Sequence, residues 1–351
     1  MNNHAATIPT TSSGDGNGEL TPDSLGRRFF NIRTLVSFGV AFAILFFVFQ
    51  KMDLDVRDII SHIRTANPAL YLAALVVYYS TFLVRSVRWK LLLENVGLTE
   101  TAGYKLPSVL GLAEVIFLSW FANCIMPAKL GDAYRAYLLK RNAQVSFSKT
   151  FGTILAERII DLLLTFVLLA ITGLIAFHGT LPPEIVAGAQ GSLALVALTI
   201  FGLVAMRNLG PLIRRLLPAR FRGHYAHLED GTLNSFRRMP LVLAYSLVAW
   251  IIEAARLYFV VLSLGLAAIS FPVVLLIAIA ESLLTSVPGT PAGLGVVEGT
   301  IIMILVLAGH LGLAPGMNDG LAASVAILDR TISYWSLVLF GAITYLLSRK
   351  K

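Results

Sequence analysis

Charged side chains inside apolar runs are the residues of this sequence that could carry chemistry. Glu157, Arg158 and Asp161 fall within one helical turn of an otherwise apolar stretch at about 151–177. A charge inside a membrane span costs at least about 2.5 kcal/mol on insertion scales, so it usually faces a partner or a cavity. The three side chains are therefore predicted to share a polar interior. Two interpretations stay open, a functional site or an ion network that only braces the fold.

A second polar set follows the apolar run at about 107–126. Its pattern is Asn123-x3-Pro127-x3-Gly131-Asp132-x2-Arg135. Because proline breaks a helix, Asp132 is predicted to lie at the start of a returning half-helix, where the helix dipole favours a carboxylate. Arg135, one turn later, could reach Asp132 or a lipid phosphate. The simpler alternative is a capping aspartate and a snorkelling arginine.

The third set is a Pro/Gly-rich break at 288–299, between apolar runs that begin at Phe271 and end at Leu307. Broken backbone at membrane depth survives only where protein or a water-filled cavity satisfies its polar groups. In transporters, such breaks are where substrates and ions bind. We expect both breaks to act as hinges, through Pro127, Gly131, Pro288, Gly289, Pro291, Gly293 and Gly295.

Further charges extend the internal set. They are Arg88 in the first half, and Glu253, Arg256, Glu281, Glu298, Asp329 and Arg330 in the second. Because a buried carboxylate can titrate near neutrality, Asp161 or Glu298 could carry a coupling proton.

Composition explains which elements must position these residues. The chain has 351 residues, of which 56% are hydrophobic and 14% charged, and its mean hydropathy is +0.76. Soluble domains are about a quarter charged, and continuous apolar runs of roughly 17–25 residues indicate helices rather than a barrel. The sequence therefore predicts an all-α polytopic membrane protein. The net charge of +8 fits loops facing anionic headgroups and predicts no nucleic-acid partner.

Hydropathy and charge predict a topology. Residues 1–25 are expected to be a disordered tail, and residues 26–351 a single integral membrane domain with both termini cytoplasmic. Arg85, Arg88 and Lys90 with Trp89 mark the cytoplasmic end of one span, and residues 51–67 could form an interfacial helix. The stretches at 107–126 and 270–310 are predicted to be broken re-entrant hairpins. About six full spans are predicted, at 34–50, 69–87, 151–177, 190–206, 240–264 and 321–347.

Three marks recur in order and predict an inverted repeat with halves at about 69–206 and 240–347. The offset between the copies is 168, 164 and 172 residues, respectively. The matched marks are Arg88 and Gly97-Leu98 with Arg256 and Gly265-Leu266, Pro127 to Gly131 with Pro291 to Gly295, and Glu157-Arg158-Asp161 with Asp329-Arg330-Ser333. An odd number of crossings separates the two halves, so the second copy is inverted. Substrate sites in such folds lie where the repeats meet.

Together these motifs resemble the lysylphosphatidylglycerol synthase transmembrane-region family, also called flippase-like domain proteins. The resemblance covers nearly the whole chain after residue 30. It implies movement of a lipid between leaflets, since relatives are associated with aminoacylated phosphatidylglycerol, hopanoid pathways and dolichol-linked glycan assembly. The soluble synthase domain has no counterpart in this sequence, so the resemblance implies the flippase-like half alone.

The leading hypothesis is a lipid translocase of a bacterial inner membrane, and not an enzyme. Arg88, Arg135, Arg158 and Arg330 would attract the headgroup of an anionic phospholipid, hopanoid or polyprenyl-linked lipid. The alternatives are an accessory subunit that presents lipid to a separate lipid-modifying enzyme, and a membrane-embedded transferase. We predict no catalytic residue, metal or cofactor. The residues expected to bind the headgroup are Arg88, Asn123, Asp132, Arg135, Glu157, Arg158, Asp161, Glu298 and Arg330.

Overall fold

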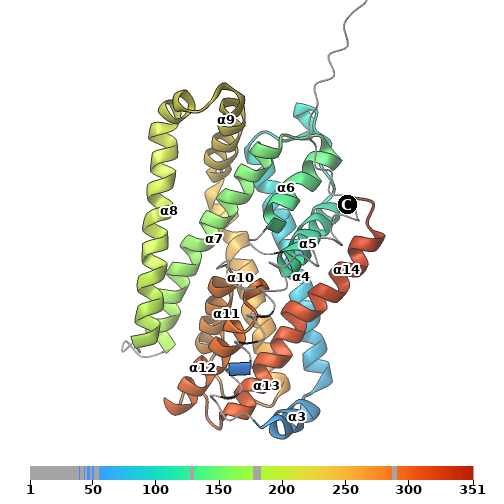
Figure 1. The fold of residues 1–351 in the computed structure, drawn as a ribbon. Helices are drawn as coiled ribbons and strands as arrows, with labels where there is room; N and C mark the ends of the chain where they lie inside the picture. Colours follow the sequence, from blue (N-terminus) through green and yellow to red (C-terminus); the bar gives the residue numbers. More distant parts are fainter. Residues whose placement is uncertain are drawn as a thin grey trace, which may run out of the picture.

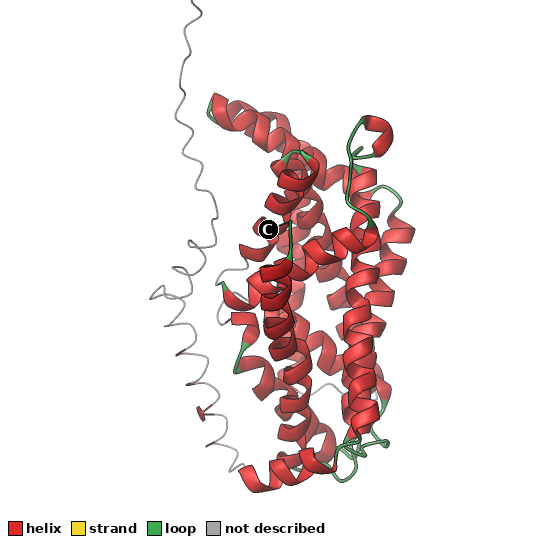
Figure 2. Ribbon diagram, turned by 90° about the vertical axis from the view of Figure 1, so that its right-hand side faces the viewer, coloured by secondary structure: helices red, strands yellow, loops and turns green. Residues whose placement is uncertain are grey.

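The computed structural model describes residues 55–126, 130–176, 183–286 and 291–350, with isolated positions between 39 and 50. These residues form helices and connecting loops and contain no strand (Figure 2). The predicted tail at 1–25 and nearly all of the predicted span at 34–50 lie outside the described residues. The α-helices are α3 (Val56–Thr65), α4 (Pro68–Asn95), α5 (Val109–Ile125), α6 (Leu130–Ala143), α7 (Phe147–Ala176), α8 (Pro183–Leu216), α9 (Ala219–Leu233), α10 (Met239–Ser263), α11 (Phe271–Ser286), α12 (Val296–His310), α13 (Asp319–Arg330) and α14 (Leu337–Leu347).

Five helical segments in the described part are long and apolar enough to cross a membrane. They correspond to the five predicted spans that the structure describes, and they confirm an all-α polytopic membrane protein. The last one is α13 joined to α14 through a π-helical segment, Thr331–Ser336. The segments are Pro68–Ala102, Phe147–Ile175, Ala189–Leu216, Met239–Ser263 and Asp319–Leu347.

Two helix pairs are too short to cross fully. Helix α5 has 17 residues, and at 1.5 Å per residue it spans about 25 Å, less than the roughly 30 Å of a bilayer core. Helices α11 and α12 have 16 and 15 residues. The pairs α5–α6 and α11–α12 lie toward opposite ends of the bundle (Figure 1). This arrangement matches the two predicted hairpins, whose connecting residues 127–129 and 287–290 are outside the described part.

The two halves of the chain run in opposite directions. Helices α4 and α10 pack along each other, and the N–H of Asn67, which caps the start of α4, donates to the carbonyl of Ser263 at the end of α10 (2.7 Å). At the other end, the Asn95 side chain donates to the carbonyls of Ser235 (3.0 Å) and Arg237 (2.5 Å), just before α10. The first helices of the two halves are therefore antiparallel, as an inverted repeat requires.

The same turn ends both of these helices. Gly97 and Gly265 each have φ +79°, a left-handed conformation that favours glycine. The N–H of Leu98 donates to the carbonyl of Leu93 (3.0 Å), and that of Leu266 to Val261 (3.3 Å), which is the Schellman pattern in both cases. This cap explains why Gly-Leu recurs at the same distance after Arg88 and Arg256.

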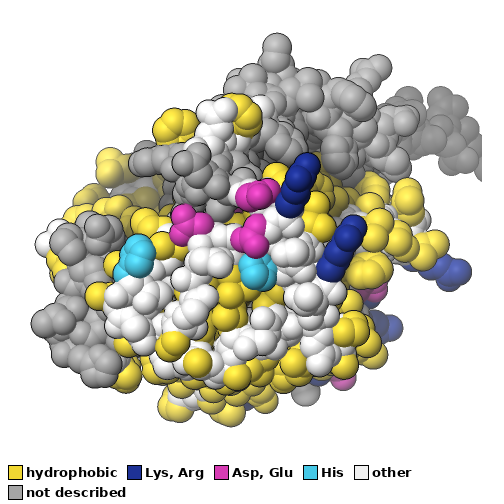
Figure 3. Space-filling model, turned by 90° about the horizontal axis from the view of Figure 1, so that it is seen from below, with side chains coloured by type: hydrophobic (Ala, Val, Ile, Leu, Met, Phe, Trp, Pro, Cys, Tyr) yellow, Lys and Arg dark blue, Asp and Glu magenta, His cyan; other side chains and the backbone are white. Residues whose placement is uncertain are grey.

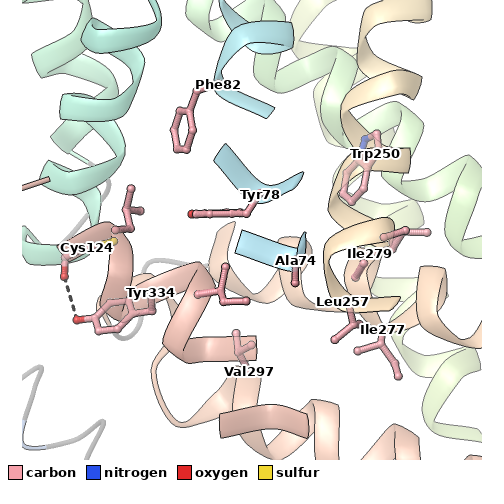
Figure 4. Close-up of a cluster of buried hydrophobic side chains, with 14 of the residues drawn as sticks. Ala74, Tyr78, Phe82, Cys124, Trp250, Leu257, Ile277, Ile279, Val297 and Tyr334 are labelled. Carbon is pink, nitrogen blue, oxygen red and sulfur yellow. Dashed lines mark hydrogen bonds between the residues drawn. The ribbon is translucent and has the colours of Figure 1, made fainter. Parts of the chain in front are cut away.

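Buried apolar side chains join the two halves. Tyr78 of α4 and Tyr334 of the π-helical segment lie in the cluster drawn in Figure 4, together with Trp250 and Ile277 from the second half. The Tyr334 hydroxyl donates to the carbonyl of Cys124 at the end of α5 (3.4 Å). Cys124 is a buried free thiol. The tip of the first hairpin is thus held against the last span.

The short helix α3 covers one end of the bundle. Asp55 caps it by accepting from the N–H of Arg57 (2.8 Å), and Ile59 packs it against α13. Charged side chains on this end are few and of both signs (Figure 3). The arginines of the α8–α9 region lie at the opposite end, on the same side as the described C-terminus (Figure 1).

Gly131 sits where the two helices of the first hairpin touch. Its N–H donates to Asn123 Oδ1 (2.8 Å), and its carbonyl accepts from Ser119 Oγ (2.8 Å). A Cβ at this position would overlap the Ser119 carbonyl oxygen and lie 2.6 Å from Asn123 Oδ1. In this structure Gly131 therefore serves the close approach of α5 and α6, and its expected role as a hinge stays a prediction.

We expect Gly131→Ala to lower the free energy of unfolding by about 1–3 kcal/mol, because one methyl group must push the two helices apart. Thermal unfolding in detergent micelles, followed by size-exclusion fluorescence, measures the effect. Gly202→Ala is the matched control, since a Cβ on that exposed α8 glycine meets nothing within 4 Å. Equal melting temperatures for the two variants would contradict the packing role.

Candidate functional site

A cavity of about 450 Å³ lies between the two halves. Its wall combines residues of α4, α5, α7, α10, α11 and α13 with the starts of α6 and of the second break. Five of the predicted headgroup residues line it, namely Asn123, Asp132, Arg158, Asp161 and Arg330. The other four, Arg88, Arg135, Glu157 and Glu298, are buried and belong to ion pairs behind this wall.

Arg88 joins α4 to α7. Its Nη1 donates to Asp161 Oδ1 (2.5 Å) and to Ser246 Oγ of α10 (2.8 Å), while Nη2 lies 2.9 Å from Glu157 Oε1. The Arg88 side chain is 1% exposed. The prediction that Arg88 and Trp89 mark an interfacial end of the span is wrong, because α4 continues to Asn95 and both side chains are fully buried.

Arg135 of α6 completes this first ion network. Both of its Nη atoms donate to the Glu157 carboxylate, at 3.2 and 3.0 Å, and its guanidinium stacks on Trp89 at 3.8 Å from the ring centroid. Arg135 therefore pairs with Glu157 of α7 rather than with Asp132. Its burial excludes the snorkelling alternative, since the side chain is 1% exposed.

Arg158 is the accessible arginine of the first network. Its Nε and Nη2 donate to the two oxygens of Asp132, at 2.9 and 2.8 Å. Asp132 is the third residue of α6, so the pair fastens the returning half-helix to α7. The Arg158 side chain is 32% exposed, far more than those of Arg88 and Arg135.

Arg256 holds the second network together. It donates to Asp329 of α13 and, through Nη2, to Glu281 of α11 (2.8 Å). Asp329 follows Arg256 by 73 residues, as Asp161 follows Arg88. By this spacing the Arg256–Asp329 contact corresponds to Arg88–Asp161, four residues away from the predicted match of Asp329 with Glu157, which Arg88 also contacts.

Arg330 fastens the second break. Its Nε donates to Glu298 Oε1 (2.8 Å) and its Nη2 to the carbonyl of Ala292 (3.0 Å). Glu298 is the third residue of α12, as Asp132 is of α6, and its other oxygen accepts from the N–H of Gly295 (2.6 Å). Each returning half-helix thus presents an acid at its third residue to an arginine of the following span.

The backbone of the second break departs from a helix in its described part. Ala292, Gly293 and Gly295 have φ of +46°, +72° and +87°, and Pro291 begins a short 3₁₀ turn. Glycine adopts such values without steric cost, whereas alanine does not. The predicted hinge residues Pro127, Pro288 and Gly289 lie outside the described part of the chain.

Two residues outside the predicted headgroup-binding set connect the halves across the cavity. Arg85 Nη2 donates to Glu253 Oε1 (3.3 Å), and its guanidinium lies 4.9 Å from the Trp120 ring. Glu253 in turn lies 3.5 Å from Arg256 Nε. The internal repeat could have predicted this contact. Arg85 and Glu253 are separated by 168 residues, which is also the offset between the matched residues Arg88 and Arg256, so they occupy equivalent positions in the two halves.

The described charges of this region nearly cancel. Six arginines face seven carboxylates through the ion pairs above, so the site has no unpaired arginine among these six. The arginines are Arg85, Arg88, Arg135, Arg158, Arg256 and Arg330, and the acids are Asp132, Glu157, Asp161, Glu253, Glu281, Glu298 and Asp329. Within the described ranges, no group of acidic, histidine or cysteine side chains has the arrangement of a metal site.

Comparison with known proteins gives a family for this arrangement. Residues 34–341 match the family described as the lysylphosphatidylglycerol synthase TM region. The chain belongs to this family. A UPF0104 membrane protein of Methanocaldococcus jannaschii is 38% identical over 64% of the chain and 93% of its own length, and one of Pyrococcus horikoshii is 28% identical over 81% and 89%. Glycosyltransferase AglD of Haloferax volcanii is 25% identical over 86% of the chain, which spans 52% of that relative.

Proposed function

We propose that this member of the family is a lipid translocase, which moves a lipid with a polar headgroup between the leaflets. The observation that carries the proposal is the charged cavity between two broken hairpins that enter the bundle from opposite ends. Broken hairpins in inverted repeats are the elements around which transporters alternate access. A polar cavity inside apolar helices suits a headgroup, while the lipid chains stay in the bilayer.

The charge distribution supports an orientation in the membrane. The arginine-rich α8–α9 connection and the described C-terminal residues lie at one end (Figure 1), whereas the α3 end carries few charges (Figure 3). Because Lys and Arg gather on the cytoplasmic side, we propose that the α8–α9 end, the N-terminus and the C-terminus face the cytoplasm. A bacterial inner membrane remains part of this proposal.

Reconstitution tests the transport proposal. Proteoliposomes should move fluorescent anionic phospholipid between leaflets faster than empty liposomes, and Arg158→Ala should lower that rate by at least about ten-fold, because it removes the accessible cation of the cavity. Arg238→Ala is the matched control, since that arginine is 58% exposed and pairs with Glu94 away from the cavity. Equal rates for wild-type and empty liposomes with anionic, hopanoid and polyprenyl-phosphate lipids would overturn the proposal.

A second candidate function is an accessory subunit that presents lipid to a lipid-modifying enzyme. The observation that favours it is the match to about half of a relative named a glycosyltransferase. In that case the protein should co-purify with such an enzyme, raise its product yield and show no transport alone. An assay of product formation from radiolabelled donor and lipid also tests the third hypothesis, a membrane-embedded transferase. In that case the purified chain should form the product without a partner enzyme.

A further inference from the structure

The cavity wall holds hydrogen-bond donors that no side chain of the described structure uses. Arg158 donates from Nε and Nη2 to Asp132, and its Nη1 has no hydrogen-bond partner in the described ranges. Asn123 uses its Oδ1 to accept from Gly131, and its Nδ2 donates to none of the described residues. Both side chains line the cavity.

These two donors are fixed to consecutive residues. Asn123 binds Gly131 and Arg158 binds Asp132, so both are anchored at the start of α6. Arg85 and Trp120 add donors to the same wall, since Arg85 Nη1 and Trp120 Nε1 also have no hydrogen-bond partner among the described residues. Trp120 lies one turn before Asn123 on α5.

The carboxylates on the wall are already engaged by arginines. The two oxygens of Asp132 face Arg158, and those of Asp161 face Arg88. Glu253 lies between Arg85 and Arg256, and the remaining carboxylate of the wall, Glu281, lies between Arg256 and Arg330. A cavity with free donors and occupied carboxylates suits a ligand made of acceptors, even though its formal charges nearly cancel.

We propose that Arg158 Nη1 and Asn123 Nδ2 form a subsite for a phosphate group, with Arg85 and Trp120 at its edge. Phosphate offers only acceptor oxygens when fully ionised, and a guanidinium is its preferred partner. The inference rests on the proposed function in taking the phosphate from a lipid headgroup, while free inorganic phosphate shares the same chemistry. It also assigns Arg88 and Arg135 to the support of the wall rather than to the ligand.

Asn123→Asp tests the subsite with little change in shape. The new carboxylate can still accept from the Gly131 N–H, but it replaces the Nδ2 donors with a negative charge. Isothermal titration of the purified protein in detergent micelles with dioctanoyl phosphatidic acid should show at least about ten-fold weaker binding for this variant. Arg158→Lys, which keeps the charge and loses the free Nη1, should also weaken binding and serves if Asn123→Asp does not fold.

Ser119→Ala is the structural control. It removes the other side-chain contact to Gly131 without changing the cavity wall, so it should lower the melting temperature and leave the affinity for phosphatidic acid unchanged. Inorganic phosphate and dioctanoylglycerol separate the sources. Tight binding of inorganic phosphate supports the subsite with a free ion as its ligand, whereas equal affinities for phosphatidic acid and neutral dioctanoylglycerol overturn it.

These experiments test the phosphate subsite and the translocase proposal independently of each other. Unchanged affinity for phosphatidic acid in both Asn123→Asp and Arg158→Lys overturns the subsite, even if the wild-type protein transports lipid. Conversely, binding that depends on Asn123 and Arg158 supports the subsite, even if the wild-type protein transports nothing and the translocase proposal falls.

Discussion

Replacing Arg256 with alanine is expected to destabilise the protein severely, by about 3–5 kcal/mol in the free energy of unfolding. The guanidinium is 2% exposed and faces Asp329, Glu281 and Glu253. Its removal takes the ion-pair partner of buried Asp329 away inside the membrane, where water cannot replace it, and leaves Glu253 and Glu281 with one arginine each. Membrane accumulation and the thermal midpoint in detergent micelles measure the loss.

Arg238→Ala provides the control for Arg256, because it removes one exposed ion pair of the kind that contributes roughly 0–1 kcal/mol. Arg256→Ala combined with Asp329→Asn should recover part of the lost stability, because the second change neutralises the carboxylate that has lost its ion-pair partner. A single variant Arg256→Ala that accumulates and melts like Arg238→Ala would show that the ion network does not hold the second half together.

Replacing Arg330 with methionine is expected to loosen the second break and to lower transport by at least about ten-fold. Two hydrogen bonds disappear, one to Glu298 at the start of α12 and one to the carbonyl of Ala292, which has a left-handed backbone. The amides of residues 293–299 should therefore exchange hydrogen faster. Exchange followed by mass spectrometry reports the loosening, and the proteoliposome assay reports its effect on transport.

Arg64→Met is the matched control for Arg330, because Arg64 is an exposed arginine of α3, away from the cavity. It should change neither the exchange at 293–299 nor the transport rate. If Arg330→Met leaves exchange at the break at the wild-type level, then Arg330 does not hold this backbone. Unchanged transport with faster exchange would instead mean that the order of the break does not limit the rate.

The two halves fasten their broken hairpins with ion pairs of the same kind but in part with different residues. In each half an arginine of the first helix pairs with an acid of the span that follows the hairpin, and an arginine of that span pairs with the third residue of the returning half-helix. The first half adds Arg135 with Glu157, while the second adds Arg256 with Glu281. The accessible arginine lies in the first half, so we expect the ligand to bind closer to the first hairpin than to the second.

Hydropathy and backbone chemistry by themselves determined the elements of this protein. Apolar runs long enough for a bilayer became the spans, because a helix is the only single segment that satisfies its own backbone there. Proline and glycine marked both breaks, since neither sustains a helix. The sequence likewise predicted that Arg158, Asp161 and Arg330 share an interior, and the cavity brings them together.

Only the tertiary structure decided which charges pair and which face the cavity. Arg88 and Trp89 have the pattern of an interfacial anchor, yet both are buried, because α10 and α7 pack over them. Arg135 pairs with Glu157 rather than with Asp132, which is nearer in the sequence, because α6 packs along α7. The spacing of residues along the chain shows which side chains share one face of a helix. Which ion pairs they form depends on the neighbouring helix against which that face packs. The Pro/Gly breaks could be predicted from local rules, but the arginines that fasten them could not.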